Sequence, residues 1–229
     1  LDDDGESGTL TITNISDSST ILDTVVGDHE PCFGKSPGQT CEGTAALYVG
    51  SLSGQQYMVT PSGCNDSTTP TCDNVATDTV SKNFGPNGNI SGVESEFIAS
   101  TKSSLQGEVN TPNLASAGGT AAQFCQNMVY GGYSDWFLPD KTELSFLYCR
   151  SAPAAGHQAG KPEDEPDCTA WGGKTYEIPN FSGNRYWAST QWAFITTSSA
   201  WTLNFGSVDI GDQTRSDLHL VRCVRKYTP

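Results

Sequence analysis

The alternation of apolar and polar positions along the chain predicts several short strands. Residues 45–49 and 57–59 place apolar side chains at every second position on either side of a Ser/Gly turn at 51–54, which is typical of a β-hairpin. Successive side chains of a strand point to opposite faces, so this alternation indicates strands with one buried face. Further strands are predicted at residues 9–15, 185–190, 200–205 and 219–227.

Between these groups of strands the spacing of apolar residues becomes helical. Thr120 and Gln123 have the spacing of a capping box, and apolar residues on one helical face follow them. Asp140 and Glu143 repeat this spacing ahead of a second apolar face. The sequence therefore predicts two short amphipathic helices, joined by residues 131–139.

Together these elements predict an α+β domain, in which two short helices lead into a short antiparallel sheet and long loops connect the elements. Residues 1–8 are acidic and rich in Gly and Ser, so we expect a lead-in or linker there. Residues 9–110 are expected to form a loop-rich β region. We expect that region to belong to the same domain as residues 111–229, which hold both helices and the final strands.

Eight cysteines are dispersed along the chain without the spacing of a zinc site. An even, dispersed set in a loop-rich chain predicts four disulfides and an oxidising, extracellular compartment. Loop closure favours partners that are close in sequence. We therefore expect the pairs Cys32–Cys41, Cys64–Cys72 and Cys149–Cys168, which leaves Cys125 to pair with Cys223.

The formal charge is −14, and no basic run is present. Nucleic acid and anionic membrane surfaces are therefore not expected as partners, since both require a cluster of Lys and Arg. No stretch approaches the length of about 18 apolar residues that a membrane span requires, so no membrane insertion is expected. The chain starts at Leu1 without a signal-like apolar segment, which suggests a processed product or a fragment.

Four blocks in the second half of the chain resemble the signatures of one protein family. They are residues 132–139 (GYSDWFLP) with Glu143 and Leu144, residues 186–190 (YWAST), residues 200–205 (AWTLNF) and residues 221–225 (VRCVR). The corresponding family signatures are G-x-DWRLP-x-x-x-EL, YWSST, and AW-x-V-x-F followed by VRCVR. The family is DUF1566, which includes the C-terminal domain of the Legionella collagen-like adhesin. The resemblance covers residues 120–227.

This resemblance implies a compact α+β domain of C-type-lectin-like or formylglycine-generating-enzyme-like fold in a bacterial surface protein. It also implies the head of a fibre or collagen-like stalk, which is sometimes trimeric and binds host or prey glycans. Phe137 stands where the family signature has Arg. The family's adhesin favours sulfated polyanions, which a chain of charge −14 should repel, so that ligand class is not expected here.

The tryptophans inside the matching blocks are expected to be core residues rather than ligand platforms. They are Trp136, Trp187 and Trp201. At least one of Arg222 and Arg225 is expected to anchor the fold through a carboxylate such as Asp135.

Candidate ligand-binding residues lie outside those blocks. Trp171 and Trp192 fall in predicted loops, where an aromatic face suits stacking on a sugar ring. Asn184 and Arg185 are polar neighbours that could bind the sugar hydroxyls. We therefore predict that these four residues form one recognition face, on the final loops (184–185 and 191–194) and the Cys149–Cys168 insertion.

No cofactor is expected, although acidic residues raise the possibility of calcium. The candidates are residues 2–6, residues 163–167, and the set Asp209, Asp212 and Asp217, with solvated acidic loops as the alternative interpretation. No nucleophile elbow, phosphate loop, zinc-protease motif or dinucleotide motif is present, so an enzyme is not expected.

The sequence as a whole therefore predicts an extracellular domain that binds glycans or glycoconjugates on another cell surface. It is expected to act as a homotrimer at the tip of a surface fibre. The alternative interpretation is a structural fibre or pilin-like assembly subunit without a small ligand.

Overall fold

The computed structural model describes residues 10–13, 20–23, 31–65, 67, 71–72, 78–96, 104–151, 166–175, 177–193 and 198–227. Several sequence predictions fall elsewhere in the chain. The lead-in at residues 1–8, the acidic residues 2–6 and 163–165, and Phe194 all lie outside the described residues.

In the described part of the chain the strands form three sheets. The strands are β1 (Leu10–Thr13), β2 (Thr20–Asp23), β3 (Leu47–Leu52), β4 (Gln55–Val59), β5 (Ser81–Lys82), β6 (Ser95–Glu96), β7 (Arg185–Trp192), β8 (Ser199–Asn204), β9 (Asp209–Thr214), β10 (His219–Leu220) and β11 (Val224–Tyr227). The first sheet is the hairpin β1–β2, the second has the order β5-β10-β7-β8-β9 with β6 also on β7, and the third has the order β11-β4-β3.

The large sheet is mixed, which corrects the prediction of an antiparallel sheet. Strands β7, β8 and β9 are antiparallel neighbours, but β10 and β6 both pair with β7 in parallel. These parallel pairings come from short segments far away in sequence. Alternation within each segment predicts a strand, but it contains no information about which distant strand becomes the neighbour.

The small sheet joins the two halves of the chain. Its hairpin β3–β4 is the one predicted from alternation, and its two-residue turn has positive φ angles at Ser53 (52°) and Gly54 (81°). Both positive angles fit the primed turns whose twist matches that of the flanking strands. Strand β11 pairs with β4 from Val224–Val59 to Tyr227–Gln56, so the last strand of the chain completes a sheet begun near residue 47.

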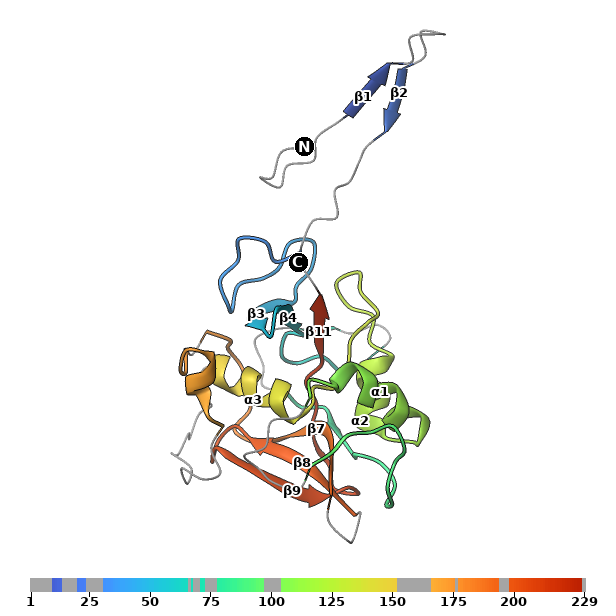
Figure 1. The fold of residues 1–229 in the computed structure, drawn as a ribbon, viewed down its shortest axis with the longest axis vertical. Coiled ribbons are helices and arrows are strands. Elements are labelled where there is room, and N and C mark those ends of the chain that lie inside the picture. The colour runs from blue at the N-terminus through green and yellow to red at the C-terminus, as the bar shows by residue number, and fades with distance from the viewer. Residues whose placement is uncertain are drawn as a thin grey trace.

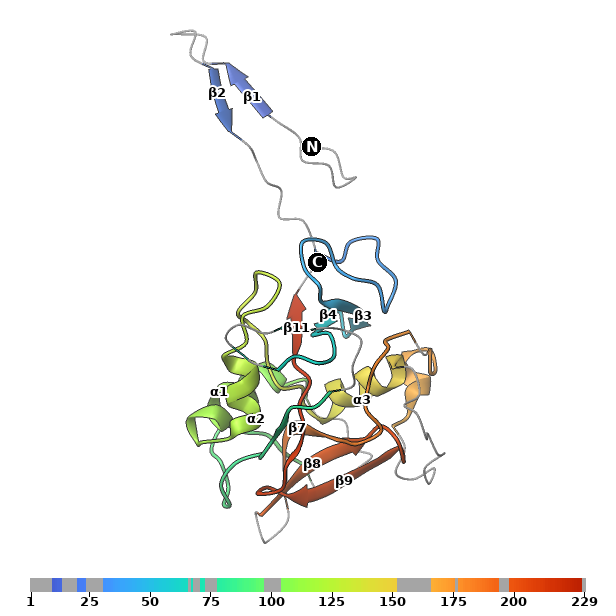
Figure 2. The same cartoon turned by 180° about the vertical axis from the view of Figure 1, so that it is seen from behind.

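Three α-helices and one 3-10 helix are present in the described residues. They are α1 (Gly107–Ser116), α2 (Thr120–Gln126), α3 (Lys141–Arg150) and η1 (Cys168–Trp171). Figures 1 and 2 show α3 between the small sheet and the large sheet, with α1 and α2 together at one flank. The α+β prediction is confirmed. Among the described residues, no helix has the length and apolar character needed to cross a membrane.

The two predicted helix starts differ in outcome. The capping box at Asp140 is confirmed, because the Glu143 N–H donates to the Asp140 side chain and the Asp140 N–H donates to Glu143 Oε2, each at 2.8 Å. The capping box predicted at Thr120 is wrong. Gly119 occupies the N-cap without a side-chain bond, and Thr120 instead hydrogen-bonds Asn83 at 3.1 Å. This tertiary contact replaces the local cap.

Three more elements differ from the prediction. Helix α1 was not expected, since it contains Pro112 and lacks a clear apolar stripe. Strand β9 was also missed because its residues are mostly polar and do not alternate. The predicted strand 219–227 is divided into β10 and β11, because Arg222 and Cys223 turn inward between them and the chain passes from the large sheet to the small one.

All four predicted disulfides are confirmed. They are Cys32–Cys41, Cys64–Cys72, Cys149–Cys168 and Cys125–Cys223. No cysteine is free. The core prediction for the block tryptophans is also confirmed, because Trp136, Trp187 and Trp201 are at most 2% exposed.

Candidate binding groove

A groove of about 270 Å³ opens beside β11, between α1 and the segment that follows α2. Helix α1 forms one wall, the end of α2 and residues 134–137 form the other, and the side chain of Lys226 reaches in from β11. We call this site the groove, and its lining residues are Glu108, Thr111, Pro112, Gln126, Ser134, Asp135, Trp136, Phe137 and Lys226.

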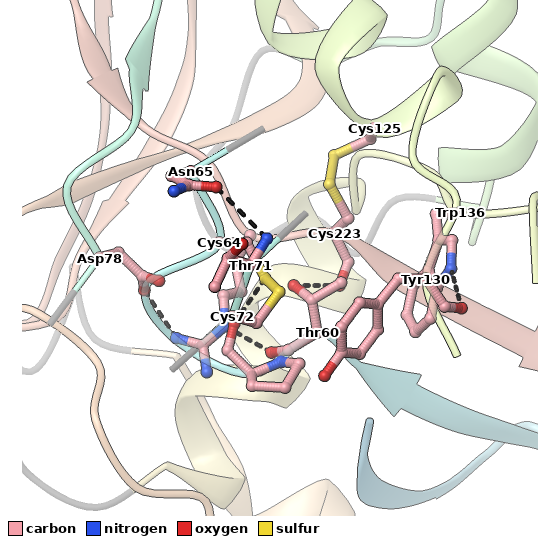
Figure 3. The surroundings of a disulfide bond; sticks show 12 residues. Thr60, Cys64, Asn65, Thr71, Cys72, Asp78, Cys125, Tyr130, Trp136 and Cys223 are labelled. Carbon is pink, nitrogen blue, oxygen red and sulfur yellow. Dashed lines mark hydrogen bonds and ion pairs between the residues drawn. A yellow bond between two sulfur atoms is a disulfide. The ribbon is translucent and has the colours of Figure 1, made fainter. Parts of the chain in front are cut away.

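The family signature block builds one wall of the groove. Phe137 pairs with Val224 through two backbone hydrogen bonds of 2.8 and 2.9 Å, which hold residues 134–137 alongside β11. Trp136 turns inward and donates from Nε1 to the carbonyl of Tyr130 at 3.2 Å (Figure 3). Ser134 and Asp135 remain exposed at the rim as a result.

Helix α1 supplies the opposite wall of the groove. Thr111 ties the helix to the signature block, because its hydroxyl oxygen accepts the Leu138 N–H at 3.0 Å. Pro112 lies inside the helix and has no N–H. The carbonyl of Glu108, four residues earlier, therefore lacks its ordinary α-helical donor, and Glu108 and Pro112 both line the groove.

Lys226 is held firmly within the groove. Its ammonium lies 3.2 Å from Glu108 Oε1 and donates to the carbonyl of Leu105 at 3.3 Å. It also lies 5.8 Å from the ring centroid of Phe137, the residue that replaces the Arg of the family signature. The Lys226 side chain is 12% exposed, whereas that of Glu108 is 53% exposed. The positive charge is therefore engaged internally, while the carboxylate faces solvent.

Asp135 at the rim pairs with Arg225, which confirms the predicted anchoring role for one of the two C-terminal arginines. Arg225 Nε donates to Asp135 Oδ1 at 2.5 Å, and its guanidinium lies 3.9 Å from the ring centroid of Tyr133. The Asp135 side chain is 57% exposed and that of Arg225 is 13% exposed. This acid, like Glu108, lines the groove with more than half of its side chain exposed.

Behind the groove, Glu143 secures the junction of α1 and α3. Its carboxylate accepts the hydroxyl of Tyr57 at 2.9 Å and the N–H of Asp140 at 2.8 Å. Burial and the neighbouring Asp140 carboxylate raise the pKa of Glu143 well above its usual range. A Cβ on Gly107 would lie 2.2 Å from Glu143 Oε2, so the start of α1 requires glycine here.

The Cys125–Cys223 disulfide connects two of the elements that form the groove. Figure 3 shows it running from α2 to the segment that leads into β11. Cys125 precedes the groove residue Gln126, and Cys223 lies three residues before Lys226. The disulfide therefore fixes α2 relative to β11.

Asn184 and Arg185 lie at the start of β7, where both bond to other residues of the domain. Asn184 Nδ2 donates to Ser182 Oγ at 2.8 Å. Arg185 donates to Thr202 Oγ1 at 3.1 Å and forms an ion pair with Asp209 on β9. These contacts brace the start of β7 against the adjoining turn and strands.

Trp171 and Trp192 do not lie in loops, which corrects their predicted setting. Trp171 ends η1 with its ring centroid 5.8 Å from that of Phe146, and Trp192 ends β7 with its ring centroid 4.7 Å from that of Trp201. Both rings are half-buried against the core. Both tryptophans therefore contribute to packing around the core.

The predicted recognition face is also more dispersed than expected. Arg185 and Trp192 are the first and last residues of β7. At the usual rise per residue of a strand, their backbones are about 23 Å apart. One sugar ring cannot bridge that distance, so individual contacts of these residues with a longer ligand stay predictions.

The structure gives no support for calcium at the C-terminal acidic set. Asp209 is paired with Arg185. Across the ranges described above, no three His, Cys, Asp or Glu side chains come together in a way that could hold a metal ion.

Two buried arginines join distant segments: Arg222 has the anchoring role expected for at least one of the C-terminal arginines, whereas Arg215 was not expected from the sequence. Arg222 Nη1 donates to Asp78 Oδ2 and its Nε to the carbonyl of Thr60, at 2.6 and 2.7 Å. Arg215 donates to the carbonyls of Pro86 and Gly88 and to the side chain of Gln191. Burial lowers the pKa of Arg215 to about 10. No local pattern identifies their partners, because most of these lie more than a hundred positions away in the chain.

The signature block that forms a groove wall lies within a longer region that matches a known family. The chain matches the family described as the Lcl C-terminal domain over residues 68–225. The protein belongs to this family. The match begins well before the motif blocks at 120–227, so the Lcl C-terminal domain includes strands β5 and β6 and all three α-helices. Comparison with curated proteins gives no match.

Proposed function

We propose that this Lcl C-terminal domain mediates attachment at a cell surface by binding glycans or glycoconjugates of another cell, and that it is not an enzyme. The family is surface-associated and adhesin-like. The observation that supports binding is the groove, which combines apolar side chains with exposed hydrogen-bonding groups. Binding sites for small ligands commonly combine an apolar lining with a few placed polar groups.

The setting of the groove fits a role outside the cell. Four disulfides close loops throughout the described chain, and such disulfides persist in oxidising compartments. The proposal extends to a C-type-lectin-like head that forms a homotrimer at the tip of a fibre. Native mass spectrometry of the domain with its natural N-terminal extension tests this part, and a monomer at micromolar concentration would contradict it.

A glycan array tests the binding function. The comparison uses the parent domain, a Ser134→Trp variant that fills the groove, and a Ser91→Trp control at another exposed serine outside the groove. We expect the parent and the control to bind the same glycans and the Ser134→Trp variant to lose them. If the protein is instead a structural fibre subunit, no glycan should bind any of the three proteins.

A further inference from the structure

We infer that the groove binds an uncharged sugar ring that donates hydrogen bonds, and that it disfavours sulfated, sialylated and uronic-acid sugars. This inference rests on the proposed glycan-binding function and assigns it a site and a ligand class. It follows from which hydrogen-bonding groups of the groove are exposed and which are already engaged.

The charged side chains that the groove exposes to a ligand are hydrogen-bond acceptors. Glu108 and Asp135 expose 53% and 57% of their side chains, and an ionised carboxylate only accepts hydrogen bonds. A ligand that satisfies these groups must bring donors, and the hydroxyl groups of a sugar are such donors.

The cation in the groove is poorly placed to attract an anion. Lys226 already contacts a carboxylate and a backbone carbonyl, and only 12% of its side chain is exposed. A sulfate or carboxylate would have to displace Glu108 from Lys226 while approaching Asp135. Each like charge at contact distance lowers affinity by roughly fivefold or more.

Size and apolar lining agree with a single ring. A volume of about 270 Å³ lies just below the range of pockets that hold drug-sized ligands. Pro112 is exposed and gives the groove apolar surface, which suits the C–H face of a pyranose, while Trp136 and Phe137 lie beneath the groove at 2% and 4% exposed. The rest of an oligosaccharide would extend over the rim past Gln126 and Ser134.

The test uses defined monosaccharides and compares charge classes. Binding of methyl α-mannopyranoside, methyl β-galactopyranoside, glucosamine, glucuronic acid and N-acetylneuraminic acid is measured by NMR titration of the ¹⁵N-labelled domain. We expect at least one of the two methyl glycosides to bind, with shift changes at groove residues, and both acids to bind at least about fivefold more weakly. Tighter binding of the acids, or of glucosamine, would overturn the inference that the groove prefers an uncharged sugar.

A charge-removing variant sharpens this test. Glu108→Gln keeps an acceptor oxygen but frees Lys226, so the affinity ratio of the best methyl glycoside to glucuronic acid should fall roughly tenfold. Glu42→Gln is the matched control, since Glu42 also pairs with a lysine, at 3.0 Å, on an exposed surface away from the groove. An unchanged ratio in Glu108→Gln would contradict the inference.

A second pair of variants distinguishes a loss of sugar binding from a loss of folding. Gln126 lines the groove and Asn127 does not, although both are exposed at the end of α2. Gln126→Ala should weaken binding of the methyl glycoside severalfold, while Asn127→Ala should leave it unchanged. Equal affinities would place the sugar elsewhere. Array binding confined to anionic glycans would overturn this inference but keep the proposed function, whereas no binding to any glycan would overturn both.

Discussion

The groove and the surface around β7 contain similar residue types but differ in what their side chains contact. Around β7, Arg185 and Asp209 pair with each other, and Trp192 packs on Trp201. In the groove, Glu108 and Asp135 also pair with basic residues but keep more than half of their side chains exposed. Residue type alone therefore does not identify a binding surface. What matters is whether the hydrogen-bonding capacity of its polar groups remains open to solvent.

This difference leads to two opposite expectations for stability and ligand affinity. Changes to internally bonded residues should lower the free energy of unfolding and leave ligand affinity almost unchanged. Changes to the groove rim should lower ligand affinity and leave stability almost unchanged.

Removal of the Cys125–Cys223 disulfide should have the largest effect and should link the two regions. It closes a loop of 98 residues, so a Cys125→Ala/Cys223→Ala variant should lose about 4–5 kcal/mol of unfolding free energy in urea titrations. Sugar affinity should fall as well, because the disulfide holds the end of α2, which lines the groove, against the segment that leads to Lys226 on β11. The Cys32→Ala/Cys41→Ala variant is the control and should keep its affinity. Equal affinity loss in both variants would contradict the linkage.

Loss of the Asp78 carboxylate should lower the unfolding free energy almost as much. The buried Arg222 donates to this carboxylate at 2.6 Å, and the two side chains are 1% and 5% exposed. Asp78→Ala leaves the guanidinium buried without its counterion, which typically costs about 3–5 kcal/mol. Glu42→Ala removes an exposed ion pair and should cost less than about 1 kcal/mol. Similar losses in the two variants, measured by urea unfolding, would show that burial of the Arg222 pair is unimportant.

Truncation of the two half-buried tryptophans separates the groove from the site predicted by sequence. Trp171→Ala and Trp192→Ala should each cost about 1–3 kcal/mol of unfolding free energy, less than a fully buried tryptophan, because both rings pack on core aromatics. If the groove is the binding site, sugar affinity at a temperature where both variants are folded stays at the parent value. An affinity loss of about 1–3 kcal/mol in either variant would instead support the sequence-predicted face.

The smallest effect concerns the pH dependence of stability. Burial and Asp140 raise the pKa of Glu143 in the folded protein above its value of about 4.3 in an unfolded chain. The folded state therefore holds this proton more tightly, so the contribution is greatest below about pH 4 and is lost as pH rises through the folded pKa. A Glu143→Gln variant should lose less unfolding free energy than the parent between about pH 4.5 and 8. Parallel pH profiles would contradict the raised pKa.

A large part of the fold was predictable because its signals are local. The β3–β4 hairpin follows from alternation around a turn of Ser53 and Gly54, and the start of α3 follows from the reciprocal bonds of Asp140 and Glu143. The candidate site was not predictable in the same way. The groove combines residues from 108 to 226, and its distinguishing feature is exposure, which no local pattern encodes.

The cysteine pairing, the core position of the block tryptophans and the α+β class were all predictable from the sequence by itself. Three cysteine pairs are close in sequence and leave Cys125 and Cys223 as the fourth, the tryptophans lie in the matching blocks, and periodicity over short separations predicts the helices and strands. Only the tertiary structure decided that β10 and β6 add to β7 in parallel and that Arg222 and Arg215 join distant segments. It also decided that Lys226 faces inward while Glu108 faces the solvent. The physical reason is that burial and pairing depend on which distant surfaces meet, and those contacts exist only once the chain has folded.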